Sequence, residues 1–176
     1  MTPETVPDVT FQLRMRNDAL GGPNPFEWKA VASDEIFRGR RIVLFALPGA
    51  FTPACSESHL PGYERLHEEF RSLGVDQVIC LAVNDAFVMF QWARAQKIEK
   101  VFMLPDGNGD FTRLMGMLVD RRGQGMGYRS WRYSMLVDDG RIVKILAEPD
   151  RRDNPSGGAV QVSSAETMLA FLKSRA

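Results

Sequence analysis

One continuous stretch decides the fold: Ile42-Val-Leu-Phe-Ala-Leu47, followed directly by Pro48-Gly-Ala-Phe-Thr-Pro-Ala-Cys55. The first part is an apolar run of strand length and predicts a buried strand. The second part ends the strand with Pro-Gly and enters a segment with helical spacing, so Cys55 falls in the first turn of a helix. Unpaired backbone N–H groups and the positive end of the helix dipole there favour a thiolate over a thiol. The stretch therefore predicts a reactive cysteine at a strand–helix junction.

The segment just before Cys55 limits its chemistry. Thr52-Pro-Ala-Cys55 has the frame of a Cys-x-x-Cys redox motif with threonine in place of the first cysteine. This pair cannot close a local disulfide, but the Thr52 hydroxyl can donate to or accept from an oxygen bound beside the thiolate. We therefore expect Cys55 to be a catalytic nucleophile rather than the small buried hydrophobic residue that a lone cysteine usually is.

Outward from this stretch, the hydrophobic pattern predicts alternating strands and helices. Apolar runs or period-two alternation predict further strands at residues 9–16, 26–31, 78–83, 101–104, 132–137 and 142–147. Helical spacing predicts helices at residues 33–37, 56–73, 85–96 and 110–117 and from residue 164 onward. These elements predict a single α/β domain over residues 1–176. We expect a central mixed sheet with helices on both faces and an N-terminal β-hairpin.

Several local features refine this prediction. Ser33 should cap the helix at residues 33–37, and Asn84 or Asp85 the helix that follows them. Pro61 should bend the helix at residues 56–73, because it removes a backbone hydrogen bond. The glycine-rich residues 123–127 should form a flexible approach to the strand at Arg132.

Composition excludes several classes of protein. The chain has 176 residues, of which 44% are hydrophobic, and its 22 basic and 22 acidic residues cancel, so we expect no nucleic-acid partner. No apolar run is long enough to span a membrane, and the N-terminus has no secretory pattern. Only two cysteines are present, which indicates a cytoplasmic, reducing environment.

Three segments resemble one known family. Residues 45–62 (FALPGAFTPACSESHLPG), 80–88 (CLAVNDAFV) and 129–140 (RSWRYSMLVDDG) resemble peroxiredoxins, in particular the peroxiredoxin-5-like (type II) subfamily. The resemblance implies a thioredoxin-like fold. It also implies reduction of hydrogen peroxide and organic hydroperoxides with no metal, flavin or haem cofactor.

The resemblance also implies roles for individual residues. Cys55 is the peroxidatic nucleophile that becomes a sulfenic acid. Thr52 matches the peroxide-binding hydroxyl, and Pro48, followed by Gly49 as a candidate supporting residue, matches the proline that shields the thiolate. Arg132 matches the arginine that lowers the thiol pKa and orients the peroxide. Arg129 is the rival candidate, but the motif match falls on Arg132, and the two should face opposite sides of an extended strand.

The second cysteine, Cys80, lies in the predicted strand at residues 78–83 and has two readings. It is either a buried structural thiol or, as in some type II members, a resolving cysteine. Other members resolve with a cysteine before the last helix, but residues 157–164 contain none. The leading hypothesis is a one-cysteine cycle in which glutathione with glutaredoxin, or another external thiol, reduces the sulfenic acid. The alternatives are a thioredoxin-dependent two-cysteine cycle, a disulfide oxidoreductase, and a binding or chaperone module without enzyme activity.

The remaining signals are weaker. His59 should pack or form hydrogen bonds, with a direct role as the alternative, and no metal site is expected. Residues 106–110 begin like a calcium loop but lack its later ligands. Phe51, Phe87 and Trp131 are candidate contacts of a homodimer, and they could equally be core residues. The sequence suggests no role for the adjacent Arg121 and Arg122.

Overall fold

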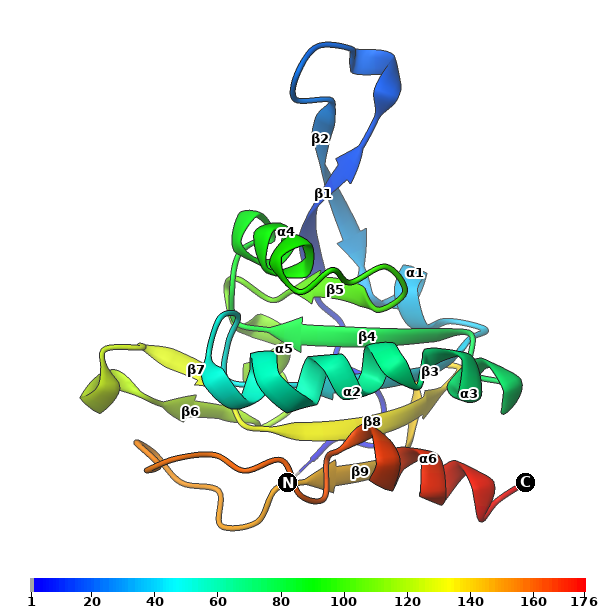
Figure 1. The fold of residues 1–176 in the computed structure, drawn as a ribbon, viewed down its shortest axis with the longest axis vertical. Helices are drawn as coiled ribbons and strands as arrows, with labels where there is room; N and C mark the ends of the chain where they lie inside the picture. Colours follow the sequence, from blue (N-terminus) through cyan, green and yellow to red (C-terminus); the bar gives the residue numbers. More distant parts are fainter. Residues whose placement is uncertain (1) are drawn as a thin grey trace.

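A five-stranded mixed sheet lies at the centre of the computed structural model, which describes residues 2–176 (Figure 1). Its strand order is β5-β4-β3-β8-β9. The strands are β3 (Arg41–Ala46), β4 (Gln77–Ala82), β5 (Phe102–Pro105), β8 (Tyr133–Asp138) and β9 (Arg141–Ala147). β3, β4 and β5 are parallel, whereas β8 and β9 run antiparallel to their neighbours. The predicted mixed sheet is confirmed, and β3, which leads to Cys55, is its middle strand.

Helices cover both faces of this sheet because its strands are apolar on both sides. One face packs against α2 (Leu60–Arg65), α3 (His67–Ser72), α4 (Ala86–Ala95) and α6 (Ala165–Lys173). The other packs against α1 (Ser33–Phe37) and α5 (Asp110–Leu114). Along β3, Val43 and Phe45 contribute to the first core and Leu44 to the second. This alternation gives the predicted thioredoxin-like arrangement.

The predicted N-terminal hairpin is present and projects from the body (Figure 1). It consists of β1 (Thr10–Arg16) and β2 (Phe26–Ala32), with a short 3₁₀ turn, η1 (Asp18–Leu20), after β1. Phe11 and Leu13 at its base are buried in the core. The base of the hairpin is therefore part of the fold, and its tip extends into solvent.

The helix after Cys55 differs from the prediction. It opens with a π-helical turn, η2 (Cys55–His59), continues as α2, and is interrupted at Leu66 before α3. Pro61, where a bend was predicted, lies just after the π-helical turn, at the point where the helix changes from η2 to α2. The wide π-helical turn therefore falls on the cysteine itself, and such turns are frequent at functional sites.

The predicted caps are partly confirmed. The Asp85 carboxylate accepts from Val88 N at 2.9 Å and caps α4, and Ser164 caps α6. Ser33 is not a cap: it lies inside α1, and its hydroxyl accepts from Val9 N at 3.1 Å, which ties the helix to the chain before β1. The helix predicted at residues 110–117 ends at Leu114.

One hairpin of the structure was not predicted. It pairs β6 (Leu118–Asp120) with β7 (Tyr128–Ser130), and a 3₁₀ turn, η3 (Arg122–Gln124), lies between them. This turn occupies part of the stretch expected to be a flexible approach. Its residues bond to the segment that follows β9: Gly123 N donates to Asn154 Oδ1 at 2.7 Å, and Gln124 Nε2 to Pro155 O at 2.6 Å. The hairpin and the segment therefore form one structure beside the sheet (Figure 1).

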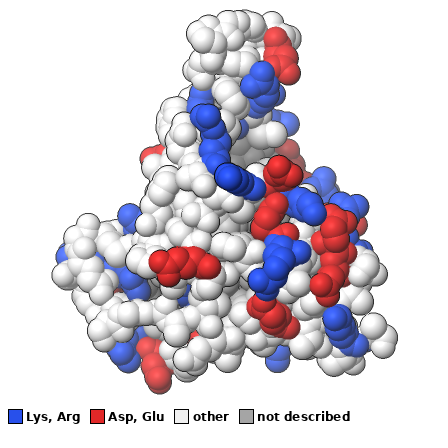
Figure 2. Space-filling model, viewed as in Figure 1, with Lys and Arg blue, Asp and Glu red and all other residues white. Residues whose placement is uncertain are grey.

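Charges of both signs are mixed over the face shown in Figure 2. Exposed ion pairs join α2 to α6 through Arg65 and Glu166, α3 to α6 through Glu69 and Lys173, and α3 to the segment before β5 through Glu68 and Lys100. These exposed pairs contribute little to stability. No helix within residues 2–176 is long and apolar enough to cross a bilayer.

Candidate active site

Cys55 lies at the predicted junction, after β3 and at the start of the π-helical turn, and its side chain has no exposed surface. The loop before it turns sharply, with Phe51 at a φ of 61°. Ser56 N then donates to Thr52 O at 3.0 Å, which closes the first turn around the sulfur. The thiol is therefore held inside the protein rather than presented on its surface.

Arg132 reaches this sulfur from 77 positions away in the sequence. It lies just before β8, is 5% exposed, and donates from Nη2 to Cys55 Sγ at 3.3 Å. A guanidinium is always charged and fixed in direction, so it stabilises negative charge on the sulfur inside a low-dielectric site. Arg129 lies in β7 instead and donates from Nε to Met126 O at 2.8 Å. The structure thus brings Arg132 to Cys55 and directs Arg129 elsewhere.

His59 holds Arg132 in place. Its Nδ1 accepts from Arg132 Nη1 at 3.0 Å, so the ring proton is on Nε2, which donates to Ser163 O at 3.0 Å. Burial, and next the charge of Arg132, lower the pKa of His59 to about 3. The imidazole is therefore neutral at physiological pH and acts as an acceptor for the arginine. It is a positioning residue.

Two further residues extend this network, and sequence reasoning missed both. The Glu148 carboxylate accepts from Ser163 N at 3.0 Å and from Ser163 Oγ at 2.7 Å, and it also accepts from the backbone of Gln161 and Val162. Burial alone would raise the pKa of Glu148, but the hydrogen bonds from Ser163, Gln161 and Val162 together outweigh it and lower the pKa. Glu148 thereby fixes the carbonyl of Ser163 that orients His59. No motif marks either residue, because the contacts join distant segments.

The residues before Cys55 form the other wall of the site. Thr52 Oγ1 donates to Gly49 O at 2.7 Å, which leaves the oxygen free to accept a further hydrogen bond. Pro48 is buried and lines a cavity together with Arg132. A Cβ on Gly49 would lie 2.7 Å from Arg129 Nη1, so glycine allows the arginine to pass close to the loop.

Cys80 lies in β4 beside Phe45 of β3 and is also fully buried. It shares an apolar cluster with Cys55, and both cysteines are free thiols. Burial, and next the negative charge of Cys55, raise the pKa of Cys80 well above its ordinary value. The charge of Arg132 favours the charged form of Cys80, but burial disfavours it more.

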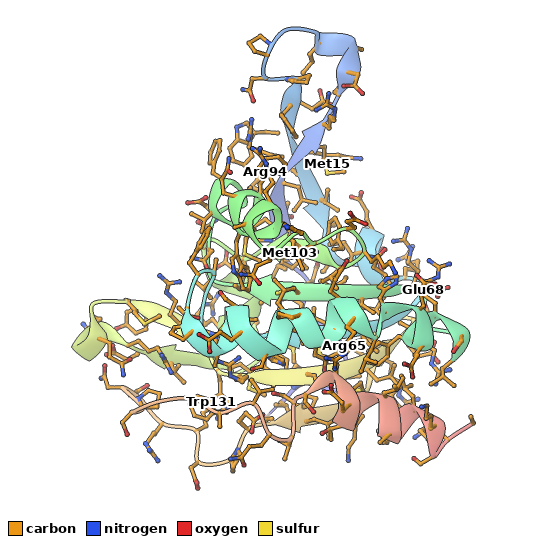
Figure 3. All side chains as sticks on the ribbon, in the orientation of Figure 1. Met15, Arg65, Glu68, Arg94, Met103 and Trp131 are labelled. Carbon is orange, nitrogen blue, oxygen red and sulfur yellow. The ribbon has the colours of Figure 1, made fainter. Side chains whose placement is uncertain are left out.

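A cavity of about 280 Å³ opens at the outer side of Arg132. Trp131, expected as a dimer contact, lines it but is only 9% exposed, and its indole N–H donates to Glu148 O at 2.8 Å. Figure 3 shows Trp131 at the end of β8 beside the segment that follows β9. The other two expected contacts, Phe51 and Phe87, are 57% and 51% exposed. Trp131 is therefore part of the site wall rather than of an outer surface.

Residues 2–176 contain no group of three or more His, Cys, Asp or Glu side chains that could hold a metal ion. The calcium-like stretch at residues 106–110 instead caps α5. The Asp106 carboxylate accepts from Phe111 N at 3.2 Å and from Thr112 N at 2.8 Å. Burial raises the pKa of Asp106.

A buried thiol beside a buried arginine on a thioredoxin-like sheet defines a thiol-dependent peroxidase, and comparisons with known proteins agree. The Redoxin family model matches residues 4–169. A peroxiredoxin of Synechocystis sp. is 57% identical over 98% of this chain and 92% of that protein. The hybrid peroxiredoxin hyPrx5 of Haemophilus influenzae is 44% identical over 98% of this chain and 66% of its own.

A solved structure shows the same fold. The antioxidant protein of Plasmodium falciparum, described as a 1-Cys peroxiredoxin, superposes with a TM-score of 0.90 at 32% identity, over 97% of this chain and 98% of that one. This chain belongs to the peroxiredoxins of the Redoxin family and is of the peroxiredoxin-5-like type. It is a thiol-dependent peroxidase.

Proposed function

We propose that Cys55 reduces hydrogen peroxide and organic hydroperoxides in a one-cysteine cycle that an external thiol completes. The observation that carries the proposal is the 3.3 Å contact from Arg132 Nη2 to Cys55 Sγ. Cys80, equally buried, makes no side-chain hydrogen bond among the described residues and has a raised pKa. One thiol therefore accepts a hydrogen bond from a guanidinium that stabilises its reactive form, and the other does not.

In the first step, the Cys55 thiolate attacks one peroxide oxygen, the O–O bond breaks, and the sulfur gains an S–OH group. The other oxygen leaves as water or an alcohol after it takes up a proton. Thr52 has its hydroxyl proton directed at Gly49 O, so its oxygen can accept from the peroxide O–H. Arg132 stabilises the charge that moves from sulfur to the leaving oxygen. Pro48 shields the sulfur from water.

In the second step, a thiol from outside the chain reduces the sulfenic acid. A Cys55–Cys80 disulfide requires Cα atoms within about 7 Å and converging side chains. Cys80 lies within a central strand that is paired on both sides, so a bridge requires local opening of β4 or of the helix that carries Cys55. We propose glutathione with glutaredoxin as the reductant. The similarity to a structure described as a 1-Cys peroxiredoxin supports this choice.

One observation favours a second candidate, the thioredoxin-dependent two-cysteine cycle. Cys80 and Cys55 belong to the same apolar cluster, and the charge of Cys55 contributes to the raised pKa of Cys80. The thiols are near enough to interact, so opening of one element could join them. Cys80 would then be the resolving cysteine.

The test uses wild-type protein, Cys55→Ser and Cys80→Ser with equimolar hydrogen peroxide. A sulfenic-acid probe should label Cys55 in wild type and in Cys80→Ser, and nothing in Cys55→Ser. Turnover is then measured side by side with glutathione plus glutaredoxin and with thioredoxin. Loss of all turnover in Cys80→Ser would support the two-cysteine cycle. Disulfide exchange without peroxide reduction would indicate a disulfide oxidoreductase.

We further propose a homodimer and a reducing cytoplasmic setting. Phe51 is exposed, and Phe87 and Trp28, also exposed, contact each other edge to face at 5.4 Å. Exposed aromatic groups are typical of interface centres. Light scattering at micromolar concentration should give twice the mass of the chain, and a monomer that persists at high concentration would contradict the dimer.

A further inference from the structure

The cavity outside Arg132 is rich in arginine. The 148–161 segment forms one side of it, and the other lining residues are Pro48, Arg121, Trp131 and Arg132. Arg152, on the segment, adds a third guanidinium. The proposed peroxide step gives Arg132 a role, but it leaves Arg121 and Arg152 without one.

Arg121 makes fewer hydrogen bonds than Arg132, although the Nε of each is buried without a partner. It is half-buried, its Nε is buried without a hydrogen-bond partner, and Nη1 contacts only the sulfur of Met126, at 3.9 Å. Its neighbour Arg122 differs: it is exposed and donates to the Asp120 carboxylate at 3.0 Å from Nε and 2.7 Å from Nη2. Within residues 2–176 no carboxylate pairs with Arg121.

The acidic groups at the cavity do not neutralise the positive charge of its arginines. Glu148 is committed to the backbone of residues 161–163 and to the Ser163 hydroxyl. Asp150 is exposed and is the only other carboxylate on the described lining. Burial lowers the pKa of Arg121, and the charges of Arg132 and Arg129 lower it further, whereas the negative charge of Cys55 raises it only in part. Two neighbouring guanidinium groups that repel each other are stabilised by an anion between or beside them.

We propose that this cavity binds the carboxylate of the small thiol that reduces Cys55, with Arg121 as the main contact. The inference rests on the proposed function, because it names the class of reductant for the same site. Arg121 supplies a fork of N–H donors that fits a carboxylate, and Arg152 adds charge at the mouth. Pro48 and Trp131, which also line the cavity, offer apolar contact to the rest of a peptide-sized thiol.

The bound thiol then acts in two exchanges. Its thiolate attacks the Cys55 sulfur, an S–S bond forms, the S–O bond breaks, and the hydroxide leaves as water after taking a proton. A second thiol attacks the mixed disulfide at the small-molecule sulfur, which releases the oxidised disulfide and the Cys55 thiolate. The two electrons that reduce the sulfenic acid come from the two thiols.

The first test measures binding without chemistry. S-methylglutathione, which keeps both carboxylates but has a blocked thiol, is titrated into reduced protein and followed by NMR. Arg121→Leu should weaken binding about 10-fold, the loss expected for a charge-assisted hydrogen-bonded pair. Arg121→Lys should retain part of the affinity, and Arg122→Leu, the matched control, should bind as wild type. The spectra also report whether each variant is folded. Equal affinity in wild type and Arg121→Leu overturns the proposal.

The second test separates the two steps of the cycle. Reduction of preformed sulfenic acid is timed with glutathione and with its diethyl ester, compared at equal thiolate concentration. Wild type should prefer the free acid about 10-fold, and Arg121→Leu should show little preference. A preference in the oxidation step only, for a carboxylate-bearing hydroperoxide over its methyl ester, overturns the assignment to the thiol. If wild type forms no sulfenic acid at all, the proposed function fails, while the binding test still decides the cavity.

Discussion

The two cysteines make the most informative comparison in this protein. Both are fully buried, both are free, and they share one apolar cluster. Cys55 begins a π-helical turn and receives a hydrogen bond from Arg132, whereas Cys80 lies in the middle of a parallel strand. Their surroundings differ in charge and hydrogen bonding rather than in exposure. Accessibility alone would rank these thiols as equals, so reactivity has to be read from their polar partners.

The largest expected effect comes from making Cys55 resemble Cys80. Arg132→Gln removes the charge beside the sulfur and should slow its oxidation by hydrogen peroxide about 100- to 1,000-fold, as the loss of a charge-stabilising donor does in other enzymes. Stopped-flow fluorescence of the nearby Trp131 measures the rate. Arg129→Gln is the matched control and should stay within about threefold of wild type. A larger loss in Arg129→Gln than in Arg132→Gln would reverse the assignment.

The next largest effect is on stability, when each cysteine in turn is replaced by serine. Cys80→Ser places a hydroxyl in an apolar strand and should lower the free energy of unfolding by about 2 kcal/mol. Cys55→Ser should cost less than about 1 kcal/mol, because Arg132 can donate to the new oxygen. Urea unfolding at neutral pH measures both. Equal losses would show that the two environments do not differ as described.

Sequence reasoning found the centre of the site and His59, but not the residues that hold His59 in place. The strand–helix junction is local, so the order of residues around Cys55 was enough to place it. Glu148 and Ser163 have no local signal, since they act only after the segment that follows β9 folds back on η2 and α2. The β6–β7 hairpin was missed because its strands are short and the segment that connects them is rich in glycine. Arg121 could gain a proposed role only once its unpaired guanidinium was seen to face the cavity.

The stability of the protein should depend on pH through His59, which positions Arg132 beside Cys55. In the described part of the chain, Cys80 has no such positioning residue. The pKa of His59 is about 3 in the folded chain, against 6.5 for an ordinary histidine. Between these values the unfolded chain binds a proton that the folded chain does not, so stability falls as the pH drops through this window. From pH 7 to pH 5 the loss from His59 is about 2 kcal/mol, and His59→Gln should remove most of it. Urea unfolding at both pH values measures the difference.

His67→Gln is the control for this prediction. His67 faces the exposed Glu68 carboxylate at 3.4 Å and lies outside the Arg132 network. Between pH 7 and pH 5, His67→Gln should lose as much free energy of unfolding as wild type does. If His59→Gln loses as much free energy of unfolding as wild type over this pH range, His59 is not buried in its neutral form.

The smallest effect concerns the loop before Cys55. In Gly49→Ala the new Cβ meets Arg129 Nη1 at 2.7 Å, but this is the flexible end of a side chain that can move. We expect a loss of stability below about 1 kcal/mol and a change in oxidation rate within about threefold. Gly62→Ala in α2, where the nearest atom is 3.7 Å away, should instead be neutral or stabilising. Thermal unfolding distinguishes the two signs.

The most direct test of the central claim, that only Cys55 takes part in the cycle, is the intact mass of the wild-type protein after one equivalent of hydrogen peroxide without reductant. The one-cysteine account predicts that the mass increases by one oxygen atom, that this oxygen maps to Cys55, and that glutathione removes it. A product that has instead lost two hydrogen atoms, with a peptide linking Cys55 to Cys80, would contradict the account.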